Sequence, residues 1–76
     1  MNTLKIQGET PFQVNAHSFA CSPSNEGYTL NYSADGVNFT AWSASTPSNE
    51  TLIVNSIAKS MYFKLVGNNS EITVRY

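Results

Sequence analysis

Few side chains in this sequence could carry out chemistry. There is one histidine, His17, and one cysteine, Cys21. His17 could serve as a general base or a pH sensor, and Cys21 could serve as a nucleophile. His17 has no acid or nucleophile at the spacing of a catalytic motif, since the one aspartate, Asp35, belongs to an Asp-Gly turn. Cys21 borders a Ser/Pro-rich stretch and has no histidine at such a spacing. We therefore predict a protein that is not an enzyme and has no catalytic residues, and we interpret Cys21 as a buried or half-buried structural thiol.

The carboxylates and metal-binding residue types do not form a site either. Glycoside hydrolysis needs two acids held roughly 5–9 Å apart, and nothing in the sequence selects such a pair. The acidic residues all fall in or beside predicted turns: Glu9, Glu26, Asp35, Glu50 and Glu71. Alternating acidic ligands of a calcium loop are absent, and one cysteine with one histidine is too few for a structural zinc site. We predict no metal and no cofactor.

The aromatic residues are the stronger indication of function. Side-chain alternation places Phe19, Trp42 and Tyr62 on strand faces opposite the predicted core residues. Outward aromatics mark a protein contact or a sugar platform; the alternative is that loops cover both faces of a thin sandwich. We predict these three as interaction residues, and a sugar platform would consist of Tyr32, Trp42 and Tyr62.

A hairpin in the middle of the chain organises these positions. Residues 28–33 and 37–42 are rich in β-branched and aromatic residues and flank Asp35-Gly36, the strongest short-range hairpin signal. Further strands are predicted at residues 3–7, 12–20, 51–55, 61–66 and 71–76, with a bulge near His17 in the second of these. Residues 43–50 form a polar connection, and residues 67–70 form a hairpin turn.

The strand pattern indicates the fold class. No ten-residue segment places apolar residues at the helical period. Seven short strands with regularly spaced turns predict an all-β, immunoglobulin-like antiparallel sandwich, formed as one domain by residues 1–76. The predicted inner layer is apolar: Leu4, Ile6, Val14, Leu30, Phe39, Leu52, Val54, Phe63, Leu65, Ile72 and Val74.

Length and composition narrow the function classes. A chain of 76 residues buries only roughly 60% of its unfolded surface, and one cysteine excludes an internal disulfide, so we expect association to add stability. Four basic and five acidic residues, with no run of either sign, exclude the basic stripe of a nucleic-acid binder and an anionic-membrane partner. Asn, Ser and Thr, 26 residues together, supply the polarity instead.

Targeting signals are also missing from the sequence. No stretch approaches the roughly 20 apolar residues of a membrane span. Met1 is followed by no charged-then-apolar leader, so we expect synthesis in a cytosol without export by the usual secretory route.

Two segments resemble known β-sandwiches. Residues 28–42, YTLNYSADGVNFTAW, resemble the YxxxYSxDGxxW hairpin of immunoglobulin-like and discoidin-like carbohydrate-binding domains. Residues 51–76 are similar to the last three strands of fibronectin-type-III-like domains. One departure is that Tyr62 shares a strand face with Lys64, whereas the corner tyrosine of that family faces the core.

The whole chain resembles the small all-β auxiliary capsid or head decoration proteins of tailed bacteriophages, including the stretch SPSNEGYTLNYSADG. The resemblance implies a virion structural protein that docks on a capsid lattice and stabilises it or displays a surface. It would be made in the host cytoplasm, and its partner would be the major capsid protein, another virion protein or a second copy of itself. The alternative is a carbohydrate-binding or fibre-associated adhesion module with a glycan partner.

Overall fold

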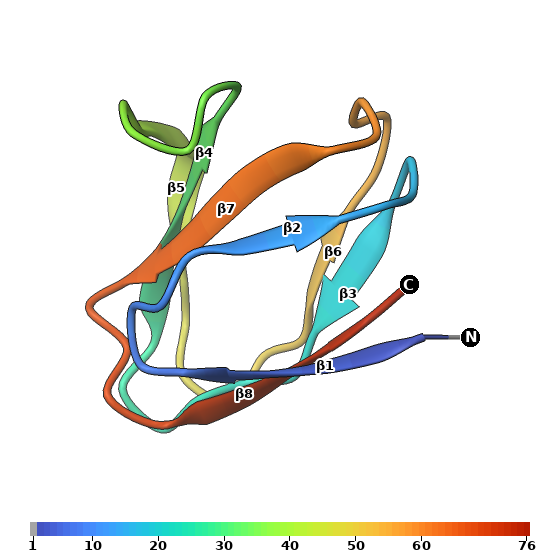
Figure 1. The fold of residues 1–76 in the computed structure, drawn as a ribbon. Helices are drawn as coiled ribbons and strands as arrows, with labels where there is room; N and C mark the ends of the chain where they lie inside the picture. The colour runs from blue at the N-terminus through green and yellow to red at the C-terminus, as the bar shows by residue number, and fades with distance from the viewer. Residues whose placement is uncertain (1) are drawn as a thin grey trace.

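The computed structural model describes residues 2–76, except for the side chains of residues 43–45. This part of the chain contains eight strands and no helix. The strands are β1 (Thr3–Gln7), β2 (Phe12–Val14), β3 (Phe19–Cys21), β4 (Tyr28–Ser33), β5 (Thr40–Thr46), β6 (Leu52–Val54), β7 (Met61–Val66) and β8 (Glu71–Arg75). The first sheet has the order β1-β8-β3-β6 and the second the order β2-β7-β4-β5 (Figure 1). All pairings are antiparallel, so the predicted all-β sandwich is confirmed.

The chain changes sheets at almost every connection. Of the consecutive strands in residues 2–76, only β4 and β5 lie in the same sheet. The prediction of a hairpin turn at residues 67–70 is therefore wrong, because β7 belongs to the second sheet and β8 to the first. In the immunoglobulin arrangement the last two strands pair within one sheet, so the connectivity of this sandwich differs from that arrangement.

The predicted strand at residues 12–20 is two strands. β2 pairs with β7 in the second sheet, and β3 pairs with β6 and β8 in the first. On one continuous strand Val14 and Phe19, five residues apart, would point to opposite faces. The break at residues 15–18 resets this alternation, so that both side chains are buried. The predicted outward position of Phe19 is wrong for this reason.

Aromatic rings fill the centre of the core. The ring centroid of Phe63 lies 5.8 Å from that of Phe12 and 4.8 Å from that of Phe19, and Phe12 meets Phe19 edge-to-face at 6.0 Å. Burying each such side chain contributes about 1.5–3 kcal/mol. The buried apolar residues are Ile6, Phe12, Val14, Phe19, Cys21, Tyr28, Leu30, Val54, Ile57, Phe63, Leu65, Ile72 and Val74.

Most of the predicted inner layer lies in this core. Two of its members, Leu4 and Leu52, are half-buried against the core. Phe39 is the one misplaced residue, since it lies on the outer side of the second sheet, below the ammonium of Lys64.

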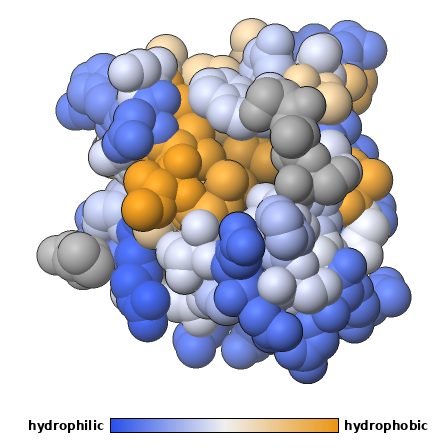
Figure 2. All heavy atoms as spheres, turned by 180° about the vertical axis from the view of Figure 1, so that it is seen from behind, coloured by the Kyte–Doolittle hydropathy of each residue, from blue (hydrophilic) through white to orange (hydrophobic). Residues whose placement is uncertain are grey.

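One side of the sandwich shows an apolar area. β5 and β6 are the edge strands of their sheets on this side, and Figure 2 shows apolar side chains on the face opposite to the view of Figure 1. Trp42 in β5 and Leu52 in β6 are half-buried and pack against the core. The core is therefore less completely covered along these two edges than at its centre.

A buried asparagine holds together two of the connections between the sheets. Asn68 is 1% exposed, and its Nδ2 donates to the backbone carbonyls of Gly8 (3.1 Å) and Ser70 (2.6 Å). Its Oδ1 accepts from the hydroxyl of Ser70 at 3.0 Å. The carboxylate of Glu9 accepts from the backbone N–H of Gly67 at 2.7 Å. Connections 8–11 and 67–70 thus stabilise each other, and backbone groups outside the strand ladders gain hydrogen-bond partners.

Replacement of Asn68 by alanine should destabilise the protein strongly. Asn68→Ala removes the donor for two carbonyls in a buried position, so we expect the free energy of unfolding to fall by about 2–4 kcal/mol. Urea unfolding followed by circular dichroism measures this change. Asn69→Ala, at the exposed neighbouring position, is the matched control and should change stability by less than about 0.5 kcal/mol. Equal effects of the two substitutions would contradict the role assigned to Asn68.

Candidate functional site

His17 is occupied with holding two connections together. Its Nδ1 lies 2.8 Å from the carbonyl oxygen of Ile57, and because a carbonyl can only accept, Nδ1 carries the proton in this contact. The backbone N–H of Ile57 donates to the carbonyl of His17 at 3.0 Å. This pair of hydrogen bonds joins connection 15–18 to connection 55–60 and lets Ile57 enter the core, which gives His17 a structural role.

Cys21 is fully buried on the inner face of β3. Burial raises the pKa of its thiol to about 12. Burial also raises the pKa of the neighbouring Tyr28 hydroxyl, and the proximity of Cys21 adds to this shift. Because the thiolate is the nucleophilic form, a thiol with this pKa is inert near neutral pH. The interpretation of Cys21 as a buried thiol is confirmed.

The thiol of Cys21 should react only after unfolding. At about pH 8 we expect no reaction of the folded protein with Ellman's reagent over minutes, and stoichiometric reaction in concentrated urea, because burial blocks access and suppresses the thiolate. A Cys21→Ala protein carrying Asn25→Cys in an exposed loop is the control for reagent activity. Reaction of native Cys21 at the rate of the control cysteine would contradict this prediction.

The structure does not bring the predicted aromatic residues together. Phe19 is in the core. Trp42 packs inward, with its ring 5.4 Å from that of Tyr32 and 6.4 Å from that of Phe63. Of the three residues, Tyr62 alone lies on an outer face, as predicted. Side chains alternate along β7, and because Phe63 is buried, Tyr62 points to the opposite side. The predicted sugar platform of Tyr32, Trp42 and Tyr62 is therefore divided between the two faces of the second sheet.

Phe39 was predicted to face the core and Trp42 to face outward, and the structure has the reverse. The cause lies in the hairpin turn. The predicted second arm began at residue 37, but β5 begins at Thr40, which pairs with Tyr32. Residues 34–39 form a wide turn around the carboxylate of Asp35. Its Oδ1 accepts from the backbone N–H groups of Val37 (2.8 Å) and Asn38 (2.9 Å). Phe39 is the last residue of this turn, directly before β5 begins. Its ring lies on the outer face of the second sheet, under Lys64.

Further hydrogen bonds complete the turn. The hydroxyl of Ser33 donates to Asp35 Oδ1 at 2.7 Å and accepts from the backbone N–H of Gly36 at 2.9 Å. The side-chain amide of Asn38 donates to Asp35 Oδ2 at 3.0 Å. These donors favour the charged carboxylate, so backbone hydrogen bonds from Asn38 and Val37, followed by the side chains, lower the pKa of Asp35 well below its ordinary value.

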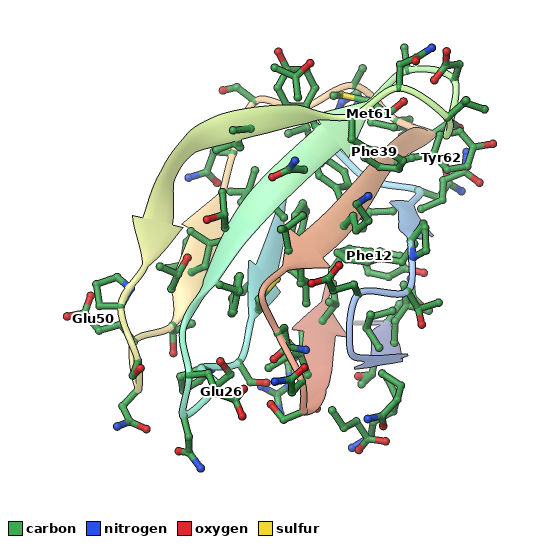
Figure 3. The ribbon with its side chains drawn as sticks, turned by 90° about the vertical axis from the view of Figure 1, so that its left-hand side faces the viewer. Phe12, Glu26, Phe39, Glu50, Met61 and Tyr62 are labelled. Atoms are coloured by element: carbon green, nitrogen blue, oxygen red, sulfur yellow. The ribbon has the colours of Figure 1, made fainter. Side chains whose placement is uncertain are left out.

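Beside this turn an aromatic patch lies on the outer face of the second sheet. We define the aromatic patch as Phe39, Tyr62 and Lys64, all half-buried. The Lys64 ammonium lies 4.7 Å from the centroid of the Phe39 ring. Phe39 and Tyr62 lie near each other at one end of the molecule (Figure 3). Val37, 78% exposed, extends from the same turn.

A glycine leaves room for the ring of Tyr62. Gly36 has a φ of 78°, a conformation that side chains disfavour. A Cβ at this position would come within 3.3 Å of the Tyr62 ring. The ring therefore lies directly against the turn, which its hydrogen bonds hold together.

The turn should make stability depend on acid. Because the pKa of Asp35 is lower in the folded than in the unfolded chain, the unfolded chain binds the proton more readily, and stability falls as the pH drops through the ordinary Asp range of about 4. Between about pH 5 and pH 2, we expect the urea midpoint of the natural protein to fall more steeply than that of Asp35→Asn.

The matched control for this measurement is Glu50→Gln. It removes one negative charge from an exposed connection and should retain the acid slope of the natural protein. An identical slope for Asp35→Asn and the natural protein would show that the turn does not depend on the ionised carboxylate.

No pocket and no group of three metal-ligating side chains occurs in the described part of the chain. Among residues 2–76 there is also no helix of the length and apolarity needed to cross a membrane. Comparison with known proteins finds no matching family model, curated protein or solved structure. The described residues form a small β-sandwich with an aromatic patch on one outer sheet face.

Proposed function

We propose that this protein is a non-enzymatic virion structural protein, an auxiliary or decoration protein that docks on a bacteriophage capsid through the aromatic patch. The observation that carries the proposal is the placement of Tyr62 and Phe39 on one outer sheet face, with Tyr62 against the turn at Gly36 and Phe39 beneath Lys64. Aromatic side chains that are rigid before binding lose little conformational freedom on docking. Tyrosine is also enriched among the residues that dominate interface energies.

The size of the molecule favours docking as the source of added stability. A stable interface buries about 800 Å² on each partner, which is roughly a fifth of the 4336 Å² accessible surface of this chain. Docking on a lattice would thus cover a large share of a small protein. The aromatic patch would lie at the centre of the contact, with neutral polar groups such as Gln13 and Asn31 of the same sheet face around it.

The resemblance to phage decoration proteins gives this binding surface its proposed partner. The resemblance is one of length, composition and short strands over the whole chain, and the stretch named in it is SPSNEGYTLNYSADG, residues 22–36. In the structure this stretch includes Asp35 and Gly36, and the ring of Tyr62 lies against Gly36. The stretch named in the resemblance therefore contributes the turn that lies beside the aromatic patch.

The proposal is tested by co-sedimentation with capsid shells of the virus that encodes the protein. We expect the natural protein to pellet with the shells and Phe39→Ser to bind about 10- to 100-fold more weakly. Phe39 lies outside the core, so the variant should keep the far-ultraviolet circular dichroism spectrum of the natural protein. Tyr62→Ser should act in the same direction.

The matched control is Ile53→Ser on β6 of the first sheet. Ile53 is 65% exposed, so the substitution removes a comparable apolar side chain from the surface away from the patch and should leave binding unchanged. Natural protein that stays in the supernatant at all concentrations would overturn the proposal. Glycan binding abolished by Tyr62→Ser, with no binding to shells, would favour the carbohydrate-binding alternative.

A further inference from the structure

Lys64 is the only charged residue in the strands of the second sheet. The other strand positions of β2, β4, β5 and β7 are apolar or neutral polar. Its ammonium lies over the Phe39 ring, so the positive charge belongs to the aromatic patch. A partner that covers this sheet must therefore accommodate one positive charge among neutral side chains.

Lys64 has no carboxylate partner in the part of the chain that the structure describes. The salt bridge found there joins Lys5 and Glu71 on the first sheet. The carboxylate of Asp35 is used within its own turn. Glu26 and Glu50 lie at the end of the molecule opposite to Phe39 and Tyr62 (Figure 3). The interaction that Lys64 makes here is with the face of an aromatic ring.

Covering the patch would remove water from this ammonium. A buried charge is costly unless an opposite charge or good hydrogen-bond acceptors replace the water. The ring of Phe39 supplies part of this stabilisation through its quadrupole. A carboxylate from the partner would supply the remaining stabilisation of the ammonium. It would also fix the orientation of docking, since Lys64 is the one cation in the strands of this sheet with which it could pair.

We infer that the partner surface presents a single carboxylate, from Asp or Glu, that pairs with Lys64 and is surrounded by apolar side chains that cover Phe39 and Tyr62. This inference rests on the proposed function, since it assigns the chemistry of the proposed capsid contact. A single cation within a sheet of otherwise neutral residues fits one acidic side chain of a protein. A polyanion or an anionic membrane would need several cations on the same face.

The test is the salt and charge dependence of binding to the same capsid shells. Dissociation constants are measured by co-sedimentation between about 50 and 300 mM NaCl, a range over which exposed charge interactions are progressively screened. The variants are Lys64→Met, which keeps the aliphatic stem and removes the charge, Lys64→Glu and Lys64→Arg. The control is Lys5→Met, on an outer position of the first sheet.

We expect Lys64→Met to weaken binding about 10-fold and to flatten the salt dependence, because the buried carboxylate of the partner then lacks its counter-charge. Lys64→Glu should abolish binding, Lys64→Arg should restore most of it, and Lys5→Met should bind like the natural protein. Unchanged affinity and salt dependence of Lys64→Met would overturn this inference and leave the proposed function standing. Absence of binding by the natural protein would overturn both.

Discussion

The whole fold depends on satisfying the backbone where the chain passes from one sheet to the other. It does so at six of the seven connections between the described strands. At each passage, peptide groups leave one strand ladder before they enter another, and in a small protein they are close to the core. Side chains supply the missing partners, as Asn68 does for Gly8 and Ser70, and His17 does for Ile57. Asn68 belongs to the Asn, Ser and Thr residues that, together with few charges, supply the polarity of this chain.

The passages also determine how much of the core the sequence could predict. Within an uninterrupted strand, alternation is sufficient, and the inward residues Phe63 and Leu65 of β7 were predicted correctly. Alternation fails across a break, since each new strand starts with its own phase. Phe19 was misplaced because residues 15–18 leave the second sheet, and Ile57 was missed because a connection carries it inward. No local sequence pattern predicts such a change of sheet, because it is determined by pairing with strands that are distant in the sequence.

The aromatic patch was predictable only where its residues lie within an uninterrupted strand. Tyr62 and Lys64 share the outer face of a regular strand, and the sequence placed both there. Phe39 was assigned to the core because the Asp-Gly signal was interpreted as a tight turn with a strand starting at residue 37. The actual turn is wider, since Asp35 accepts hydrogen bonds as far as Asn38. The sequence does contain a signal for this, because aspartate followed three residues later by asparagine allows the side chains to close a longer turn.

The turn therefore links folding to the proposed contact. Its hydrogen bonds hold Gly36 in a left-handed conformation, and the absence of a side chain at that position lets the Tyr62 ring lie against it. The same turn sets the point at which β5 begins, which directs Phe39 outward and Trp42 inward. Trp42 packs against the core and contacts Phe63, so a contact built on it would involve side chains that stabilise the sandwich. A contact built on Phe39 and Tyr62 leaves the core intact, so this surface can bind a partner without loss of the packing that stabilises the sandwich.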